Sequence, residues 1–372
     1  MKLLPFLFLL FSLPAIADVP SPPPVAARAW LLYDFASAQV LASQAADERV
    51  EPASLTKLMT AYLAFSALKQ KTLTPDKALP VSERAWKAVG SRMFIDPKST
   101  VSVDELLRGM IVQSGNDACI ALAEAIAGSE EAFARMMNRE AQRLGMRNTN
   151  FANASGLPDA KHYSTARDLA LLAAALIRDF PEHYPLYSLR EYRYNNITQQ
   201  NRNRLLWLDP NVDGVKTGYT ENAGFCLIAS ARRGTRRLLS VVLGAGSDNL
   251  RAQESQKLLN FGFQFYAAIK LYDKGQAVST VEVLKGSENR LKAGFLSDFY
   301  VSVPHGSADK VTAELISQQP LIAPISSGQR VGTMKVALEG RPMGEFAVVA
   351  LENVPMAGFF GRMWDSMKLW LK

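Results

Sequence analysis

Histidine and cysteine are scarce in this sequence, with three His and two Cys among 372 residues. Neither H-E-x-x-H nor C-x-x-C occurs, so the zinc sites built on these patterns are excluded, and we expect no metal and no cofactor. Charge of one sign is also limited. The excess of 42 Lys and Arg over 35 Asp and Glu, a net +7, is too diffuse to predict nucleic-acid binding.

The two cysteines leave a disulfide arithmetically possible. Cys119 lies in a helical pattern of small and apolar residues, and Cys226 lies in a run typical of a buried strand. Both contexts favour buried thiols over a disulfide.

Long apolar runs are lacking too. The run Leu3 to Leu13 follows Lys2 and spans about 11 residues, too few to cross a bilayer. With Ala15-Ile16-Ala17 after it, the pattern predicts a cleaved signal sequence over residues 1–17 and therefore export, with a membrane anchor as the alternative. A proline-rich tether is expected over residues 18–25.

The remaining composition, 48% apolar and 21% charged, is that of a globular protein long enough for two domains. Residues 27–42 alternate as a hairpin, and strands return at 225–231 and 238–244, joined by a solvated basic turn at 232–237. This order predicts an α+β domain over residues 18–268. Between and after these strands, helical periodicity predicts a helix from Pro52 with one apolar face, and helices at 103–113, 118–127, 130–144, 165–180 and 252–268.

The C-terminal part has a different sequence pattern. Short alternating segments separated by Gly, Pro and Ser predict a small all-β domain of sandwich type over residues 274–353. Residues 356–372 predict an amphipathic helix, with Trp364 and Trp370 on its apolar face.

A serine and a lysine three residues apart occur three times, and only one pair stands at a predicted helix start. There Ser54 and Lys57 project from one face, which suits a nucleophile and its base, and the free N–H groups of a helix N-terminus can stabilise an oxyanion. The other pairs, Ser66 with Lys69 and Ser307 with Lys310, fall at a helix end and in a β-domain turn.

Two further motifs follow in order. Ser114-Gly115-Asn116 lies 60 residues after Ser54, and Lys216-Thr217-Gly218 lies 102 residues after Ser114. Each motif is weak alone, and each residue has a structural alternative such as helix capping. The ordered set is a strong signal for a serine acyl-transfer site.

With these motifs the chain resembles the serine penicillin-recognising enzymes, and among them the low-molecular-mass D-alanyl-D-alanine carboxypeptidases. The resemblance covers nearly the whole chain after the signal sequence. The stretches that carry it are residues 52–60, 113–124, 148–174, 201–207 and 212–231.

The resemblance implies a β-lactamase/transpeptidase-like catalytic domain, an antiparallel sheet with a helical region. It implies Ser54 as nucleophile, Lys57 as general base and Ser114 as proton relay. It further implies peptidoglycan stem peptides as substrates and β-lactam antibiotics as covalent inhibitors. Expected substrate-binding residues are Asn116, Lys216, Thr217, Gly218, Tyr219, Arg202 and Arg251, with the N–H groups of Ser54 and Tyr219 as the oxyanion hole.

Two positions qualify the resemblance. Tyr219 departs from the histidine that often follows K-T-G in close relatives, a change that a backbone donor tolerates. His162 lies beside Tyr163 in a family structural motif, so we interpret it as structural.

Other functions remain as alternatives. A β-lactamase would lack the β domain and would need a separate carboxylate for fast deacylation, and none is evident. A DD-endopeptidase differs only in substrate. A slow-turnover, membrane-bound protein that shapes the cell wall would act through its β domain.

The tail suggests where the enzyme resides. Residues 359–372 span about 21 Å as a helix and cannot cross a membrane. The apolar face and a net charge of +2 over residues 356–372 suit a helix lying on anionic phospholipid. We therefore expect a periplasmic protein attached peripherally to the outer leaflet of the inner membrane, with packing on the β domain as the alternative.

Overall fold

The computed structural model describes residues 20–359 and residue 365. The predicted signal sequence and most of the predicted tail helix lie outside the described residues. The chain divides into two units, one over Pro22–Gln264 with Tyr300–Ser302 and one that includes Phe265–Phe299 and residues from Val303 onward.

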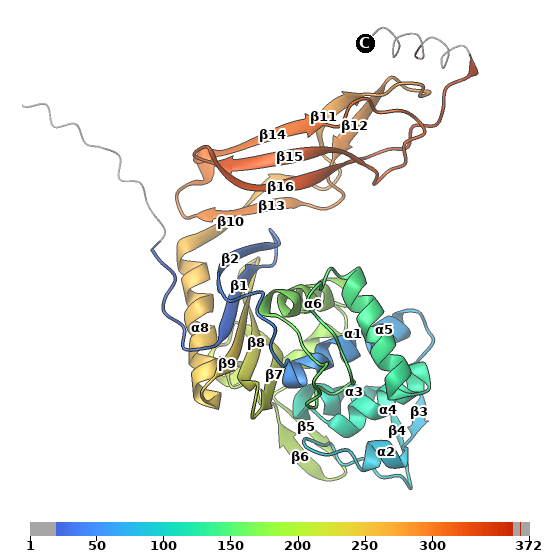
Figure 1. The fold of residues 1–372 in the computed structure, drawn as a ribbon, viewed down its shortest axis with the longest axis vertical. Coiled ribbons are helices and arrows are strands. Elements are labelled where there is room, and N and C mark those ends of the chain that lie inside the picture. Colours follow the sequence, from blue (N-terminus) through green and yellow to red (C-terminus); the bar gives the residue numbers. More distant parts are fainter. Residues whose placement is uncertain (1–19, 360–364, 366–372) are drawn as a thin grey trace, which may run out of the picture. The chain divides into compact units, whose positions relative to one another are not determined.

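The first unit is built on an antiparallel sheet with strand order β2-β1-β9-β8-β7 (Figure 1). The N-terminal hairpin and the β8–β9 hairpin pair directly through β1 and β9, so both predicted hairpins are confirmed. The bounds are β1 Ala29–Asp34, β2 Gln39–Gln44, β7 Val212–Thr220, β8 Gly224–Arg233 and β9 Arg236–Ala245.

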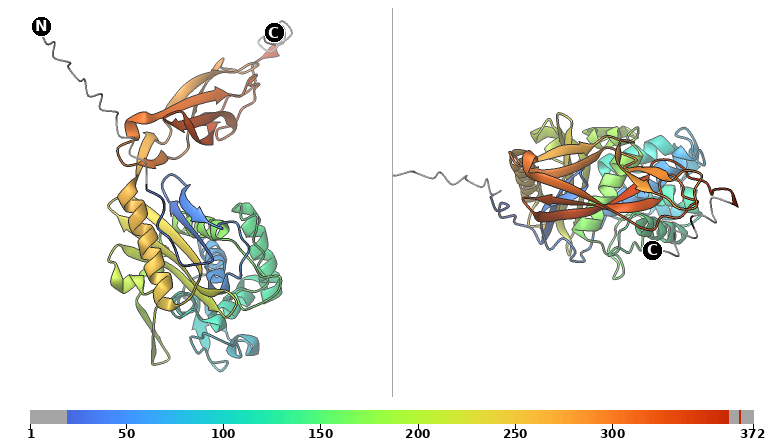
Figure 2. Two further views of the ribbon diagram at one scale, coloured as in Figure 1. Left: turned by 60° about the vertical axis from the view of Figure 1, so that its left-hand side comes forward. Right: turned by 90° about the horizontal axis from the view of Figure 1, so that it is seen from above.

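Helices cover both faces of this sheet. Helix α6 packs on β1 and β9 from one side. Helix α8 lies on the other side, where Gly262 approaches Leu32 and Leu238 so closely that a Cβ would stand within 3 Å of both (Figure 2, left). The longer helices are α1 Lys57–Lys69, α3 Val103–Arg108, α4 Asn116–Ala127, α5 Glu130–Arg143, α6 Ala166–Asp179 and α8 Asp248–Phe265.

Short elements complete the unit and border the site. The predicted helix at 103–113 is present, but its second half, η2 Gly109–Gln113, widens to a π-helical turn. The others are η1 Ala53–Thr56, β3 Ala78–Pro80, α2 Glu83–Trp86, β4 Thr100–Ser102, η3 Tyr184–Ser188, β5 Glu191–Tyr194, β6 Ile197–Gln200 and α7 Leu205–Leu208.

Helix α1 corrects the prediction of a single apolar face. Every residue from Lys57 to Phe65 is buried, because α4, α5 and α6 surround the helix. Its small side chains, Ala61, Ala64 and Ala67, allow this close approach on the side that the periodicity left unassigned.

The basic turn is also different from the prediction. Strands β8 and β9 extend to Arg233 and Arg236, so the turn shrinks to two residues. The side chains of Arg236 and Arg237 are only 14% and 12% exposed, because they pair with Asp34 and Asp213 respectively. These arginines are therefore structural ion pairs and not a solvated surface.

Helix α8 starts and ends earlier than predicted. It begins at Asp248, where the Ser247 hydroxyl accepts a hydrogen bond from the Leu250 N–H. It ends at Phe265, because the alternating residues that follow form β10 Tyr266–Tyr272 and pair with β13.

The second unit is β-rich. Strands β10 and β13 form one sheet, and β11-β12-β16-β15-β14 form another. Phe295 and Phe299 stack with ring centroids 4.2 Å apart in its core. The alternating segments expected over residues 274–353 form strands, and β10 precedes this range. The bounds are β11 Ala277–Glu282, β12 Arg290–Gly294, β13 Phe299–Pro304, η4 Ala308–Lys310, β14 Val311–Ser317, β15 Arg330–Leu338 and β16 Arg341–Ala350.

Candidate active site

The site is centred on the junction of η1 and α1. Ser54 lies in η1 and Lys57 is the first residue of α1, so the Lys57 Nζ lies 3.0 Å from the Ser54 Oγ. The other two Ser-x-x-Lys pairs lie elsewhere. Ser66 and Lys69 are at the far end of α1, where Lys69 donates to the Asp179 carbonyl. Ser307 and Lys310 are in the β-rich unit.

Lys57 is buried, and its amine contacts three oxygen atoms. Its Nζ donates to the Asn116 Oδ1 at 2.7 Å and to the Ser155 carbonyl at 2.6 Å, in addition to the Ser54 Oγ. The Asn116 amide is oriented by its own Nδ2, which donates to the Val89 carbonyl. The three oxygens thus come from η1, α4 and the turn at residues 153–157.

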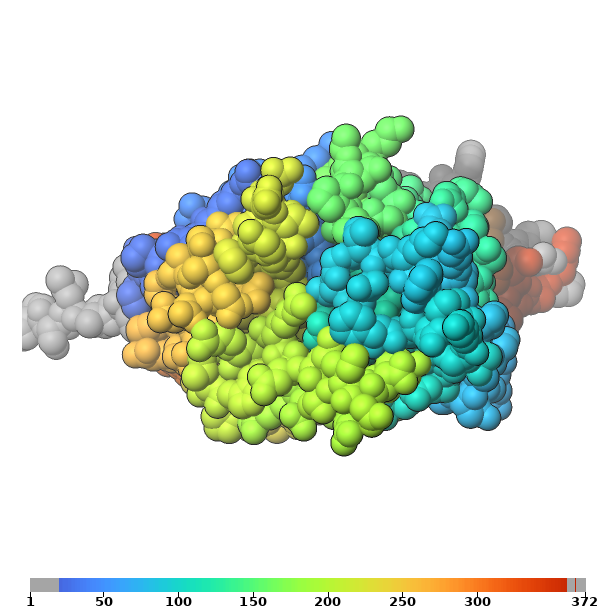
Figure 3. Space-filling view, turned by 90° about the horizontal axis from the view of Figure 1, so that it is seen from below, coloured from blue at the N-terminus to red at the C-terminus, as the bar shows by residue number. Residues whose placement is uncertain are grey.

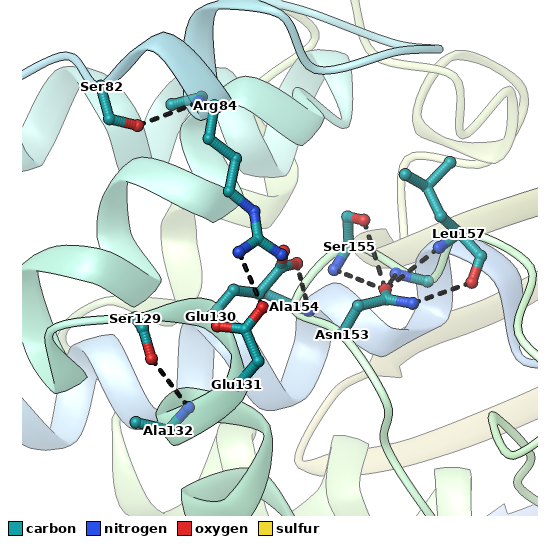
Figure 4. A network of polar contacts seen from close by, with 12 residues as sticks. Ser82, Arg84, Ser129, Glu130, Glu131, Ala132, Asn153, Ala154, Ser155 and Leu157 are labelled. Atoms are coloured by element: carbon teal, nitrogen blue, oxygen red, sulfur yellow. Dashed lines mark hydrogen bonds and ion pairs between the residues drawn. The ribbon is translucent and has the colours of Figure 1, made fainter.

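Asn153 shapes that turn (Figure 4). Its Oδ1 accepts the N–H groups of Ser155, Gly156 and Leu157, and its Nδ2 donates to the Leu157 carbonyl. This pattern closes a tight turn and directs the Ser155 carbonyl towards Lys57. Gly156 is required here, since it has a φ of +85° and a Cβ would stand 1.8 Å from the Ala53 carbonyl oxygen.

Buried Glu130 holds the start of the same turn. Its carboxylate accepts the Ala154 N–H at 3.0 Å and pairs with Arg84 at 2.6 Å (Figure 4). Thr60 of α1 donates to the Ala154 carbonyl. The turn is therefore fixed from α1, α2 and α5 together.

The Ser114-Gly115-Asn116 motif joins η2 to α4. Ser114 has a left-handed backbone, with a φ of +66°, and its buried Oγ has no hydrogen-bond partner among the described residues. Asp117, the residue after the motif, accepts the N–H groups of Met93, Phe94 and Ile95 and so holds this loop against the motif.

The third motif lies on β7, at the edge of the sheet. Gly218 runs so close to η1 that a Cβ would stand 3.3 Å from the Ser54 nitrogen. Lys216 is buried and its Nζ donates to the Thr217 carbonyl. Tyr219 is 53% exposed, and its ring packs against Phe225 at 4.4 Å.

The two predicted arginines, Arg251 and Arg202, differ in their burial and in the contacts they make. Arg251 is 5% exposed and donates to the carbonyls of Gly218 and Cys226 and to Asp248, so it supports β7 and β8. Arg202 is exposed, and it forms no hydrogen bond or ion pair with any residue in the described part of the chain.

These residues surround one cleft of about 520 Å³. Figure 3 looks onto this face, where the cyan segment before β4, the green turn and the yellow β7–β8 region meet around blue N-terminal residues. Within the described residues, no Asp or Glu lines the cleft. Its lining includes Ser54, Ser114, Asn116, Ser155, Thr217, Gly218, Tyr219, Arg202 and Arg251; Lys57 and Lys216 lie beneath it, in contact with lining atoms.

Burial controls the protonation of the two lysines. Burial lowers the pKa of Lys57, and the Arg202 guanidinium lowers it further, against opposing effects of Cys119 and Asp117. Burial also brings the pKa of Lys216 well below its ordinary value, with Lys57 and Arg202 adding repulsion. Burial is thus the main cause at both lysines, and Arg202 adds repulsion at each of them.

His162 is structural, as interpreted from the sequence. Its Nδ1 accepts the Ala152 N–H and its Nε2 lies 2.8 Å from the Thr56 Oγ1, so a neutral ring satisfies both neighbours. Burial lowers the pKa of His162 to about 4. Both cysteines are free and buried, as predicted, and the described residues hold no cluster of His, Cys, Asp or Glu suited to a metal ion.

Sequence reasoning did not identify Asn153, Ser155 and Asp117 as parts of the site. The signal for Asn153 was available, because an Asn three residues before a Gly is typical of a side-chain-stabilised turn. Ser155 contributes only its backbone carbonyl, which no side-chain pattern reveals.

Comparison with known proteins agrees with this geometry. A family model described as D-alanyl-D-alanine carboxypeptidase matches residues 16–247, and a model for the C-terminal domain of penicillin-binding protein 5 matches residues 266–356. The D-alanyl-D-alanine carboxypeptidase DacC of Escherichia coli is 44% identical over 93% of this chain and 89% of its own length.

Two solved structures are similar as well. The structure of penicillin-binding protein 5 from Haemophilus influenzae has a TM-score of 0.83 and 40% identity, over 90% of this chain and 99% of that one. The ampicillin-bound form of penicillin-binding protein D2 from Listeria monocytogenes has a TM-score of 0.60 and 34% identity, over 65% of this chain and 98% of that one. From its two matched domains and its curated relatives, the chain belongs to the serine-type D-alanyl-D-alanine carboxypeptidases of the penicillin-binding protein 5 type.

Proposed function

We propose that this carboxypeptidase releases the terminal D-alanine of a stem peptide through an acyl-enzyme on Ser54. The observation that carries the proposal is the 3.0 Å contact between the Ser54 Oγ and a lysine whose other two acceptors are fixed. In the first step the Oγ–C bond forms and the C–N bond to D-alanine breaks. Water then hydrolyses the ester and restores Ser54.

In neutral Lys57, the hydrogen-bond partners determine that the lone pair points towards Ser54. A neutral amine has two N–H donors, and Asn116 Oδ1 and the Ser155 carbonyl are acceptors only. When both N–H groups are used there, the lone pair faces the Ser54 hydroxyl, which alone of the three can donate. Lys57 is thereby arranged to take the Ser54 proton.

Other groups would stabilise the oxyanion, transfer the proton and bind the substrate carboxylate. The N–H groups of Ser54 and Tyr219 would stabilise the oxyanion, because β7 approaches η1 closely at Gly218. The unpartnered Ser114 hydroxyl would pass the proton from Lys57 to the leaving nitrogen. Asn116 would hold the substrate amide, while Lys216, Thr217 and Arg202 would bind the terminal carboxylate. Arg251 would support this end through its bonds to β7 and β8.

The same groups would be acylated by a β-lactam, as the ampicillin-bound Listeria relative suggests by analogy. The described cleft lining has no carboxylate to activate water, which favours slow deacylation over β-lactamase turnover.

Replacing Ser54 with alanine tests the nucleophile. We expect Ser54→Ala to lose both D-alanine release and covalent labelling by a fluorescent penicillin. Ser66→Ala is the matched control, since it removes a serine from a second Ser-x-x-Lys pair on the same helix, and it should retain both activities. Equal labelling of the two variants would refute the assignment.

The pH dependence of acylation tests the base. Only neutral Lys57 accepts the proton, so the acylation rate should rise with pH through the pKa of Lys57, and burial places this limb below the ordinary lysine value of 10.5. Lys57→Arg stays charged and should lose at least about 10³-fold in rate, whereas Lys69→Arg should match the wild type. A limb at the ordinary lysine value would contradict this role.

Asn153 is a positioning residue in this scheme. Asn153→Ala releases the turn, so we expect kcat to fall by about tenfold or more with little change in KM. The ammonium form of Lys57 also loses the Ser155 carbonyl as an acceptor, which lowers the pKa of Lys57. The rise of the acylation rate with pH therefore moves to lower pH.

Asn138→Ala is a suitable control, because Asn138 bonds both backbone groups of nearby Phe151 without reaching Lys57. It should reduce stability and leave the limb in place. Asn153→Asp keeps the acceptor and should recover much of the rate. An unmoved limb in Asn153→Ala would indicate a purely structural role.

We further propose that residues 356–372 attach the enzyme peripherally to the outer leaflet of the inner membrane, from the periplasmic side. No helix among the described residues is long and apolar enough to span a membrane. The support is the amphipathic pattern of the tail. Asp365, on the polar side of that pattern, is buried and accepts the Lys285 N–H at 2.6 Å.

Deleting residues 356–372 should move the enzyme from the membrane fraction to the soluble fraction with D-alanine release intact. Trp364→Glu combined with Trp370→Glu should do the same, while Ser366→Glu, on the polar side of the pattern, should stay with the membrane. Continued membrane association after the deletion would refute the anchor.

A further inference from the structure

A second cavity of about 530 Å³ adjoins the active-site cleft. It shares Arg202 and Arg251 with the cleft, so these two side chains form the boundary between the cavities. Figure 3 shows the surface where the lime β6–α7 region meets the gold start of α8. The cavity is lined by Gln200, Asn201, Arg202, Arg204, Trp207, Leu208, Asp248 and Arg251.

The position of this cavity follows from the proposed mechanism. The scissile carbonyl lies at Ser54, and the α-carboxylate of the leaving residue lies at the Arg202 end of the cleft. The second cavity begins at Arg202, beyond that carboxylate. In this arrangement the side chain of the leaving residue is the part of the substrate nearest to the second cavity.

One wall of the second cavity is held in place by hydrogen bonds. The side chain of Asn203 donates to the Gly214 carbonyl of β7 and accepts the Leu205 N–H. Leu205 is buried, whereas Trp207 and Leu208, at the other end of α7, are 43% and 58% exposed. A rigid turn thus presents an apolar surface to the cavity.

The charges of the lining point to an anion. Arg202, Arg204 and Arg251 face a single carboxylate, Asp248, which is already paired with Arg251 and lies 3.8 Å from Arg204. Arg202 forms no hydrogen bond or ion pair with any residue of the described chain. An aliphatic side chain that ends in a carboxylate matches the apolar wall and the excess of guanidinium groups.

We propose that this cavity is a leaving-residue subsite that binds the side chain of a released D-amino acid larger than D-alanine, favouring an aliphatic chain with a terminal carboxylate. The proposal rests on the Ser54 mechanism above. It also bears on the endopeptidase alternative, since a cross-link to the D-centre of a diamino diacid presents a leaving residue with a long aliphatic chain.

The test compares four peptides that end in D-Ala-D-Xaa, with D-alanine, D-2-aminoadipate, D-norleucine or D-lysine as Xaa. We expect wild-type kcat/KM for D-2-aminoadipate within about tenfold of that for D-alanine and above those for D-norleucine and D-lysine.

Trp207→Ala should lower kcat/KM for D-2-aminoadipate by about tenfold, the effect of losing one apolar contact surface, and leave D-alanine release unchanged. Arg204→Gln should reduce the preference for D-2-aminoadipate over D-norleucine. The matched control is Trp86→Ala, because Trp86 is similarly exposed at 44% but lines neither cavity, and it should affect no peptide.

The outcomes separate the two proposals. Release of D-alanine without release of D-2-aminoadipate, or equal losses on both peptides in Trp207→Ala, would overturn the subsite. Unchanged rates in Trp207→Ala on both peptides would overturn it as well. Failure to release any D-residue, D-alanine included, would instead refute the Ser54 mechanism.

Discussion

The buried amine of Lys57 is the constraint on which the rest of the catalytic unit depends. A lysine removed from water is unfavourable unless its donors are paired, and here three oxygens from three separate elements pair them. The relative positions of η1, α4 and the turn at 153–157 are therefore coupled through one nitrogen atom. Because burial also lowers the pKa of this nitrogen, the packing that holds the amine in place also suits it to the proposed role of base.

This constraint accounts for several departures from simple secondary-structure patterns. Helix α1 is buried from Lys57 to Phe65 by α4, α5 and α6, and this packing encloses the amine. The π-helical turn and the left-handed Ser114 place a hydroxyl beside the cleft at the cost of regular geometry, and Asp117 then secures the facing loop by accepting three N–H groups. Such irregular backbone is tolerated where neighbouring elements fix it from several sides.

The sequence predicted the parts of this arrangement that periodicity and motif order encode. The hairpins, most helices and the three motifs carry local signals, and Ser54 was separable from Ser66 because it precedes a helix. Contacts between distant residues carried no such signal. The pairing of Arg236 with Asp34 joins residues about two hundred positions apart, so the turn at 232–237 was expected to be solvated. The contribution of Ser155 was hidden because it is a backbone carbonyl.

Positively charged side chains predominate along the cleft. Its described lining holds Arg92, Arg202 and Arg251 and no carboxylate, with the amines of Lys57 and Lys216 directly beneath. Burial lowers the pKa of both lysines and repulsion from Arg202 adds to it, so an anionic ligand at the Arg202 end would raise the pKa of Lys216. In the proposed mechanism, the carboxylate of the substrate would therefore stabilise the cationic form of Lys216. The same carboxylate would screen Arg202, so burial rather than repulsion from Arg202 would keep Lys57 in its neutral, proton-accepting form when substrate is in place.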